Sequence, residues 1–196
     1  RNLFPNASEG ARRLLVHRAV SVREILRLKP GLFILASEYR KSEAHPFCVA
    51  ALLHGPSHIS LESALAYHGL IPEAVYQVAS VTVARSREFK TPLGIFTFRR
   101  VPARDPRAGV VAVRMGNGSW TFIASPLRAL ADMVYLNRTI NWKRDGLNYL
   151  TDSLRIEADD LARISFRPLE AICRSIRNCR TREYLTGLHQ AVKHGR

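Results

Sequence analysis

Residues 12–33 read RRLLVHRAVSVREILRLKPGLF, and this stretch predicts a basic helix, a short strand, a turn and a second strand. The helix is expected to begin near Ser8, a residue type that caps helix N-termini well, with Glu9 in the first turn where negative charge is favourable. An apolar stripe is expected to face the protein; it consists of Ala11, Leu14, Leu15 and Ala19. The four basic side chains predicted for the other flank are Arg12, Arg13, His17 and Arg18.

The hairpin is predicted from the residues that follow this helix. Residues 22–28 partly alternate between apolar and charged side chains, as a half-buried strand does. The turn Lys29-Pro30-Gly31 lets the chain reverse, because proline fixes φ and glycine tolerates positive φ, and residues 32–35 return as the second strand. A helix with such a hairpin is the order found in the back half of a winged helix-turn-helix, which places one helix in the major groove of DNA. The helix would then contact bases, and Arg23, Arg27 and Lys29 would contact phosphates or the minor groove.

The chain divides into two predicted domains. A helix-turn-helix needs at least one helix before its recognition helix, so residues 1–36 are expected to be an N-terminally incomplete winged-helix DNA-binding domain. The polar stretch that follows predicts a linker over residues 37–44. Residues 45–196 are expected to form a domain of sheet and helices, so the predicted fold class is α+β.

Patterns within this second domain predict its elements. Helices are expected over residues 46–53 and 61–68, the second one capped by Ser60, and from Ser125 onward. Strands are expected over residues 78–84, 93–98, 109–115 and 120–124, the last two joined by the hairpin signal Gly-Asn-Gly-Ser. Four strands in sequence favour a mainly antiparallel sheet, and from about Trp142 the chain is expected to be helical in about three pieces.

Positive charge is concentrated at the two ends of the chain. The net charge is +14, of which +5 lies in residues 1–40, +3 in residues 41–160 and +6 in residues 161–196. A polyanion that contacts both ends would gain from counterion release, although a merely basic surface would show the same balance. Most of the positive charge is arginine, which suits phosphate and guanine edges; a GC-rich genome would produce the same bias.

The C-terminal run RSIRNCRTREY is a candidate second basic surface. Its four basic members are Arg174, Arg177, Arg180 and Arg182. Helical spacing would place several of them on one face, which is either a solvated helix face, a phosphate-contacting surface or a surface for an acidic protein partner.

Other classes of site are not favoured by the sequence. The three cysteines have no metal-ligand spacing and form an odd set, which predicts small packing residues in a reducing cytoplasm. The longest apolar run is far too short to span a membrane, so no membrane partner is expected. Gly118-Ser119 with Asp132 resembles part of a nucleotidyltransferase site, but Val134 stands where a second carboxylate is needed. Asp159 and Asp160 are explained more simply by a helix N-terminus. We expect no metal, no cofactor and no catalytic activity.

Three motifs of the chain resemble AbiEi-type antitoxins of type IV toxin–antitoxin (abortive infection) systems. They are SLESAL with HGLI at residues 60–71, TPLGIFTF at residues 91–98, and ASPLRALAD at residues 124–132. They occur in the order of that family, and the resemblance covers roughly residues 3–136. The wing tip departs from the family's usual Arg-Gly-x-Tyr, because residues 29–33 here are KPGLF.

The resemblance implies a cytoplasmic, sequence-specific transcriptional repressor that binds double-stranded operator DNA with inverted repeats and autoregulates its operon. It also implies a functional partner, a nucleotidyltransferase-like toxin that the repressor opposes without having to contact it. The alternative is a basic module that binds structured RNA or neutralises a toxin directly. Preference for a duplex with a repeated half-site would separate these two functions.

Overall fold

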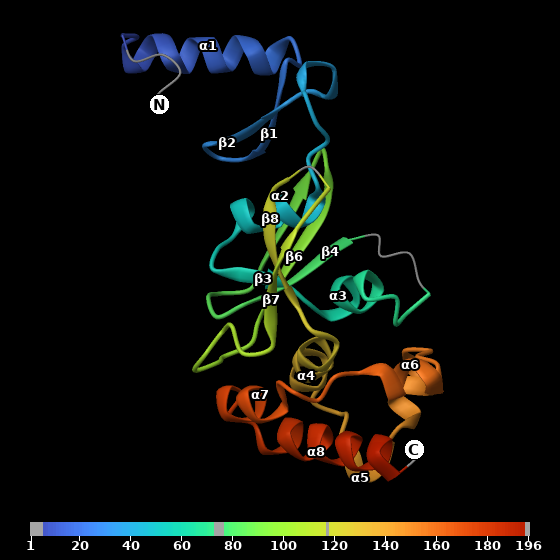
Figure 1. Ribbon diagram of the computed structural model, residues 1–196. Helices are drawn as coiled ribbons and strands as arrows, with labels where there is room; N and C mark the ends of the chain where they lie inside the picture. Colours follow the sequence, from blue (N-terminus) through green and yellow to red (C-terminus); the bar gives the residue numbers. More distant parts are fainter. Residues whose placement is uncertain (1–5, 73–76, 117, 195–196) are drawn as a thin grey trace.

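The computed structural model of the protein describes residues 6–72, 77–116 and 118–194. These residues form three parts that follow one another along one axis: a projecting helix with a hairpin, a sheet, and a layer of helices (Figure 1). The predicted α+β class is therefore confirmed. The main sheet, however, is mixed rather than mainly antiparallel.

The projecting part, which we call the arm, consists of α1 (Glu9–Ser21), β1 (Ile25–Lys29) and β2 (Leu32–Leu35). The two strands pair antiparallel, so the predicted hairpin is confirmed. The first strand begins three residues later than expected because α1 runs to Ser21 and Arg23 then adopts left-handed backbone, with φ of 62°. A helix-turn-helix needs two helices, whereas the described residues of the arm contain a single one.

Residues 46–72, 77–116 and 118–194 are called the body, which is built on a six-stranded sheet in the order β5-β6-β4-β3-β8-β7. The strands are β3 (Ser57–Ile59), β4 (Gln77–Thr82), β5 (Arg87–Thr91), β6 (Gly94–Arg100), β7 (Val110–Arg114) and β8 (Trp120–Ala124). Pairs β3–β4, β5–β6 and β7–β8 are antiparallel, and pairs β3–β8 and β4–β6 are parallel. Strand β3 lies between β4 and β8, and it pairs parallel with β8. Strand β5 lies at the edge of the sheet beyond β6, so β4 and β6 are direct neighbours and pair parallel.

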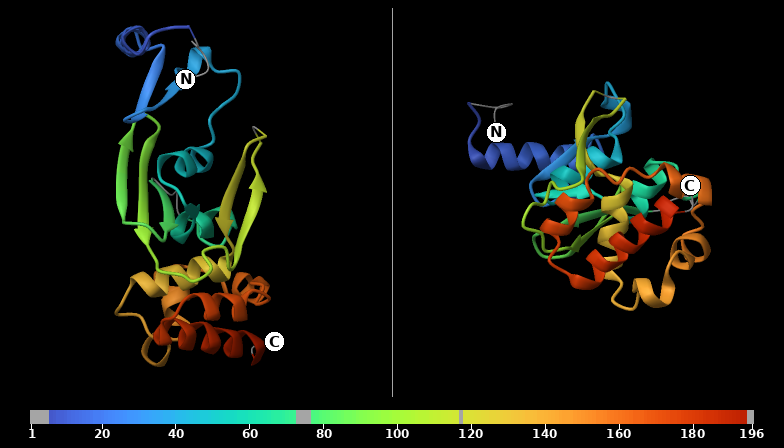
Figure 2. Two further views of the ribbon diagram at one scale, coloured as in Figure 1. Left: turned by 90° about the vertical axis from the view of Figure 1, so that its left-hand side faces the viewer. Right: turned by 60° about the horizontal axis from the view of Figure 1, so that its bottom comes forward.

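Helices cover the sheet and close one end of it. They are α2 (Pro46–Leu53), α3 (Leu61–Tyr67), α4 (Pro126–Leu136), α5 (Trp142–Asp145), α6 (Ala158–Arg163), α7 (Leu169–Ser175) and α8 (Cys179–His194). A π-helical turn covers Tyr149–Ser153, and a 3-10 turn, Ser37–Tyr39, lies within the predicted linker. In the left view of Figure 2, β5–β6 and β7–β8 rise on either side of α2, and α4, α7 and α8 lie at the far end.

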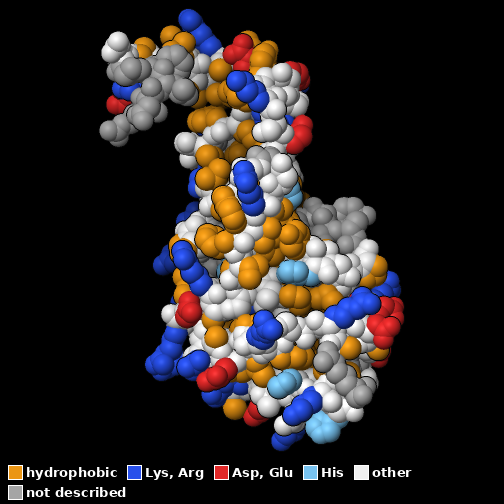
Figure 3. Space-filling view, viewed as in Figure 1, with side chains coloured by type: hydrophobic (Ala, Val, Ile, Leu, Met, Phe, Trp, Pro, Cys, Tyr) orange, Lys and Arg blue, Asp and Glu red, His pale blue; other side chains and the backbone are white. Residues whose placement is uncertain are grey.

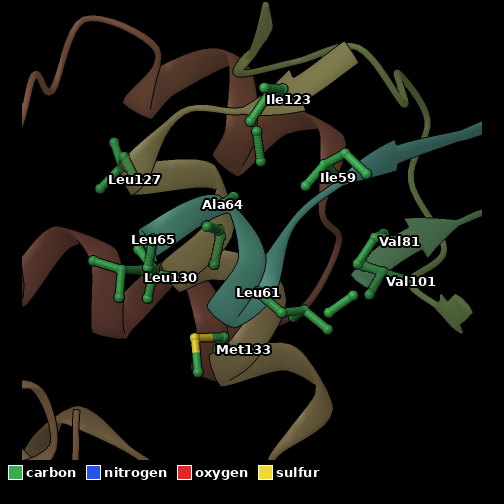
Figure 4. Close-up of a cluster of buried hydrophobic side chains, with 14 of the residues drawn as sticks. Ile59, Leu61, Ala64, Leu65, Val81, Val101, Ile123, Leu127, Leu130 and Met133 are labelled. Carbon is green, nitrogen blue, oxygen red and sulfur yellow. The ribbon is translucent and has the colours of Figure 1, made fainter. Parts of the chain in front are cut away.

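The core of the body forms where α3 and α4 pack together against the sheet. Figure 4 shows Leu65 of α3 and Leu130 of α4 side by side, and both are fully buried. Leu28 of β1 is buried in the same core. The Lys29 ammonium also donates to the carbonyl oxygens of Leu52 (2.8 Å) and Leu53 (2.7 Å), at the end of α2. The hairpin of the arm is therefore tied to the body, whereas α1 projects away from it.

Candidate nucleic-acid interface

The local sequence explains where α1 begins and ends. The Ser8 hydroxyl accepts a hydrogen bond from the Ala11 amide at 3.2 Å, which is the predicted N-cap. Glu9 lies in the first turn and pairs with Arg13 one turn later at 2.5 Å. At the other end the Val22 amide donates to the Arg18 carbonyl and closes the helix. A polar cap and a local ion pair therefore support a helix that has little tertiary contact.

The predicted apolar stripe of α1 does not face the protein. No residue of the helix is buried, and Leu14 and Leu15 are 50% and 42% exposed. The partly covered flank is instead formed by Arg12, Val16, Ala19 and Val20. The prediction of the buried face was wrong because the hairpin, which joins α1 at its C-terminal end, leaves both leucines exposed (Figure 1).

The four basic side chains predicted for the helix are consequently not on one flank. Arg13, His17 and Arg18 are exposed, whereas Arg12 belongs to the half-buried flank. Arg13 and His17 are four residues apart and so share a face, and Arg18 lies on the side of the exposed leucines. Figure 3 shows Lys and Arg side chains spread over arm and body, with Asp and Glu among them, rather than gathered in one patch.

The basic residues of the hairpin separate into two kinds. Arg23 and Arg27 are exposed and have their charges toward solvent. Lys29 is different because both of its short contacts are to carbonyl oxygens of α2. Its charge therefore caps the C-terminal end of α2, instead of standing free at the tip of a wing as the sequence predicted.

The candidate second basic surface is divided between two helices. Arg174 lies on α7 and pairs with Glu170 at 3.5 Å, whereas Arg177 lies in the connection before α8. Arg180 donates to the carbonyl oxygens of Val134 (2.7 Å) and Asn137 (2.9 Å) at the end of α4, so its role is structural.

The predicted single stripe is wrong in this respect, because one helix ends at Ser175 and the next begins at Cys179. Arg177 and Arg182 remain exposed. A phosphate surface in this region would therefore depend on these two side chains together with Arg174.

A buried polar network in the body was missed by the sequence analysis. Asp132 is fully buried and accepts hydrogen bonds from Arg128 Nε at 3.0 Å and from the Ser60 hydroxyl at 2.8 Å, with His58 Nε2 at 3.4 Å. Arg128 and Asp132 lie one turn apart on α4, and their ion pair is internal. Ser60 was predicted to cap α3; its side chain makes no capping bond and serves Asp132 instead.

The charges and hydrogen bonds of this network lower the pKa of Asp132. Burial on its own raises the pKa of Asp132, but the charge of Arg128 and the hydrogen bonds from His58 and Ser60 outweigh burial, so the pKa lies below its ordinary value. Asp132 is thus an ionised carboxylate without solvent contact at neutral pH. It stabilises the junction of α4 with β3.

Other sites considered from the sequence have structural explanations. Gly118 lies in the turn between β7 and β8, and Asp159 and Asp160 lie in the first turn of α6. Within residues 6–72, 77–116 and 118–194, no three His, Cys, Asp or Glu side chains are grouped so as to hold a metal ion. None of the helices in the described part of the chain is both long and apolar enough to cross a membrane.

Comparison with known proteins does not place the chain in a family. No family model matches it, and no curated protein matches it either. The function proposed below is therefore inferred from the arrangement of α1 and the hairpin, together with the resemblance of the three sequence motifs.

Proposed function

We propose that the protein is a sequence-specific transcriptional repressor that binds double-stranded DNA through α1. The observation that carries this proposal is the combination of a projecting helix, a complete lack of buried residues along it, and three exposed basic side chains, Arg13, His17 and Arg18. A helix that contributes nothing to the core of its own protein is available for a partner.

The dimensions of α1 suit the major groove of DNA. Its 13 residues span about 20 Å at roughly 1.5 Å per residue, and the major groove, about 12 Å wide, admits one α-helix. Arg13 has the length and the donors to reach guanine O6 and N7, and the rim of the groove offers phosphates to Arg18. Because Glu9 pairs with Arg13 at 2.5 Å, that ion pair would have to open when the arginine contacts a base.

The hairpin has a modified role in this proposal. Arg23 and Arg27 are exposed beside α1 and supply sequence-independent phosphate contacts. Lys29 fixes the hairpin to α2 and so determines how the helix is held relative to the body. The biological setting that goes with this assignment is autoregulation of an operon that also encodes a nucleotidyltransferase-like toxin, in the manner of AbiEi-type antitoxins.

One observation favours a second candidate function. Leu14 and Leu15 are exposed on α1 next to Arg18, and apolar side chains on a projecting helix suit a protein partner better than a phosphate backbone. Direct binding of a toxin, or of a structured RNA through the same basic residues, is therefore the alternative to binding duplex DNA.

Selection from a random library separates these functions. The full chain is incubated with random-sequence DNA duplexes, bound molecules are amplified and sequenced over several rounds, and the enriched duplex is then competed with structured RNA. We expect enrichment of one motif that occurs as a repeated half-site, and weak competition by RNA. Failure to enrich any motif, or equal competition by RNA of unrelated sequence, would reject sequence-specific DNA binding.

A further inference from the structure

A pocket of about 530 Å³ opens in the body, away from α1. It lies between the end of α2, the strands β3 and β4, and the start of β7, and it is lined by Ala51, His58, Val81, Val110 and Arg128 among others. Pockets of about 300–1,000 Å³ with mostly apolar walls and a few polar groups are typical of small-molecule sites. The volume is therefore sufficient for a small metabolite.

The walls of the pocket are chiefly apolar. Val81 and Val101 are almost completely buried and contribute side chains to it, and Phe122 lies at its edge with 40% of its surface exposed. A hydrocarbon or aromatic group placed against these three residues would be removed from water, with a gain of about 25 cal/mol for each Å² of apolar surface. The main body of an occupant is thus expected to be apolar.

A buried guanidinium group provides the polar end. Arg128 is fully buried and lines the pocket. Its Nε donates to Asp132 at 3.0 Å and its Nη1 to the Ala108 carbonyl at 2.7 Å. The third nitrogen, Nη2, donates to no other described residue and is not fully enclosed. It is the part of the guanidinium that is left for an occupant, in a site where a charge-assisted hydrogen bond is strong.

Among the neighbouring groups, Arg107 is the one that favours an anionic occupant. His58, which is 7% exposed, also lines the pocket, with Nε2 directed to Asp132 and Nδ1 unpartnered among the described residues. Arg107 lies at the edge, its guanidinium 5.2 Å from the centre of the Phe122 ring. Asp105, the carboxylate at the rim, already accepts a hydrogen bond from the Arg107 amide at 2.9 Å. The donors of the pocket are Arg128 Nη2 and the Arg107 guanidinium, whereas Nδ1 of His58 is an acceptor when Nε2–H donates to Asp132.

We propose that this pocket binds a small carboxylic acid with an apolar body. The carboxylate accepts a hydrogen bond from Arg128 Nη2, and the apolar part lies against Val81, Val101 and Phe122. Binding is non-covalent and uses a part of the molecule distinct from α1, so it stands or falls independently of DNA binding.

The test compares octanoate with its uncharged analogue octanamide. Each compound is titrated up to about 5 mM, a range that detects affinities near 1 mM, into the full chain with labelled valine methyl groups, and methyl NMR shifts are followed. We expect octanoate to shift the methyl signals of Val81, Val83, Val101 and Val110. Octanamide should bind about tenfold or more weakly, because its neutral carbonyl oxygen accepts a weaker hydrogen bond from the guanidinium than a carboxylate oxygen does. Absence of shifts with octanoate, or equal affinity for the two compounds, would overturn the proposal.

Two variants at exposed residues of α2 test the location of the binding site without disturbing the core. Ala51 is exposed on α2 and lines the pocket, whereas the next residue, Leu52, is 62% exposed and does not line it. Ala51→Phe should fill the entrance and lower the affinity for octanoate by about tenfold or more, and Leu52→Phe should change it less than about twofold. Arg128→Lys is expected to bring octanoate and octanamide closer in affinity. If that variant does not fold, the Ala51→Phe comparison still decides the result, and an unchanged affinity there would contradict the proposed site.

Discussion

Two helices of this protein begin with the same capping chemistry and end up in opposite environments. α1 and α4 each have a serine N-cap whose side chain accepts a backbone hydrogen bond, from Ala11 and Arg128 respectively. α4 buries eight of its 11 residues, whereas α1 buries none of 13. Local signals therefore determine that a helix forms, but not whether its face belongs to the core.

The charges on the two helices differ in the same way. On α4 the pair of Arg128 and Asp132 is internal and completed by further hydrogen bonds, and it holds the helix against β3. On α1 the pair of Arg13 and Glu9 has side chains 80% and 76% exposed. Surface pairs of this kind contribute little to stability, so opening this pair would cost the fold little.

The largest effect is expected from removing the buried carboxylate. Asp132→Ala leaves Arg128 buried without its partner, which typically costs about 3–5 kcal/mol in the free energy of unfolding. Arg13→Ala, the matched change in the exposed pair, should leave the urea unfolding midpoint unchanged within error. Equal destabilisation by both variants would show that α1 is part of the stable core after all.

Acid should weaken the same buried pair without any substitution. The pKa of Asp132 is lowered in the folded protein, so its contribution to stability is complete above the unfolded pKa of about 3.9 and is lost as the pH falls through the lower, folded value. We compare the unfolding free energies of the wild-type protein and Asp132→Asn between neutral and strongly acidic pH. The difference between them should shrink as the pH falls below about 4. A difference that stays constant would mean that ionisation of Asp132 does not stabilise the fold.

Alanine substitutions at two glycines, one on α8 and one on α1, are expected to change stability in opposite directions. A Cβ on Gly187 of α8 would lie 2.2–2.4 Å from atoms of the Trp142 ring, whereas a Cβ on Gly10 of α1 meets nothing within 4 Å. Gly187→Ala is therefore expected to destabilise the protein by about 1–3 kcal/mol, and Gly10→Ala to stabilise α1 by up to about 1 kcal/mol. Thermal unfolding measures the first and helical circular dichroism the second. Destabilisation by Gly10→Ala would indicate that α1 packs closely against something.

A smaller effect is expected where the arm joins the body. Lys29→Ala removes two hydrogen bonds to the end of α2, and we expect a local loss of about 1 kcal/mol. The variant should speed amide hydrogen exchange in β1 and β2 without DNA present. Arg27→Ala, an exposed change in the same hairpin, serves as the control and should leave exchange unchanged. If the two variants behave alike, Lys29 does not anchor the hairpin.

Much of the body could be predicted because its signals are local. The helix at residues 46–53, the strand Trp120–Ala124 and its hairpin with β7, and the capped helix after Ser125 all appear as expected. The strands that were missed carry weak patterns. β3 has three residues, and β5, with sequence REFKT, is a largely polar edge strand. Without β3 and β5 the sheet could only be expected to be mainly antiparallel.

The polar network and the orientation of α1 depend on contacts between distant parts of the chain. His58 and Ser60 lie 74 and 72 residues before Asp132, and no sequence periodicity joins them. The one available signal was a charged pair, Arg128 and Asp132, within a helix that is otherwise apolar. The leucines of α1 were expected to face inward because apolar residues usually do, and only the placement of the hairpin shows that they do not.

The central claim is that α1 reads base pairs, and fluorescence anisotropy on an enriched duplex and on its scrambled counterpart tests it most directly. Arg13→Ala should cost about 1–3 kcal/mol on the enriched duplex and much less on the scrambled one at fixed salt, because a bidentate contact to a base is lost. Arg182→Ala, an exposed change on α8 far from α1, should leave the ratio of the two affinities unchanged. If Arg13→Ala weakens binding to both duplexes by the same factor, α1 does not read the sequence and the account is contradicted.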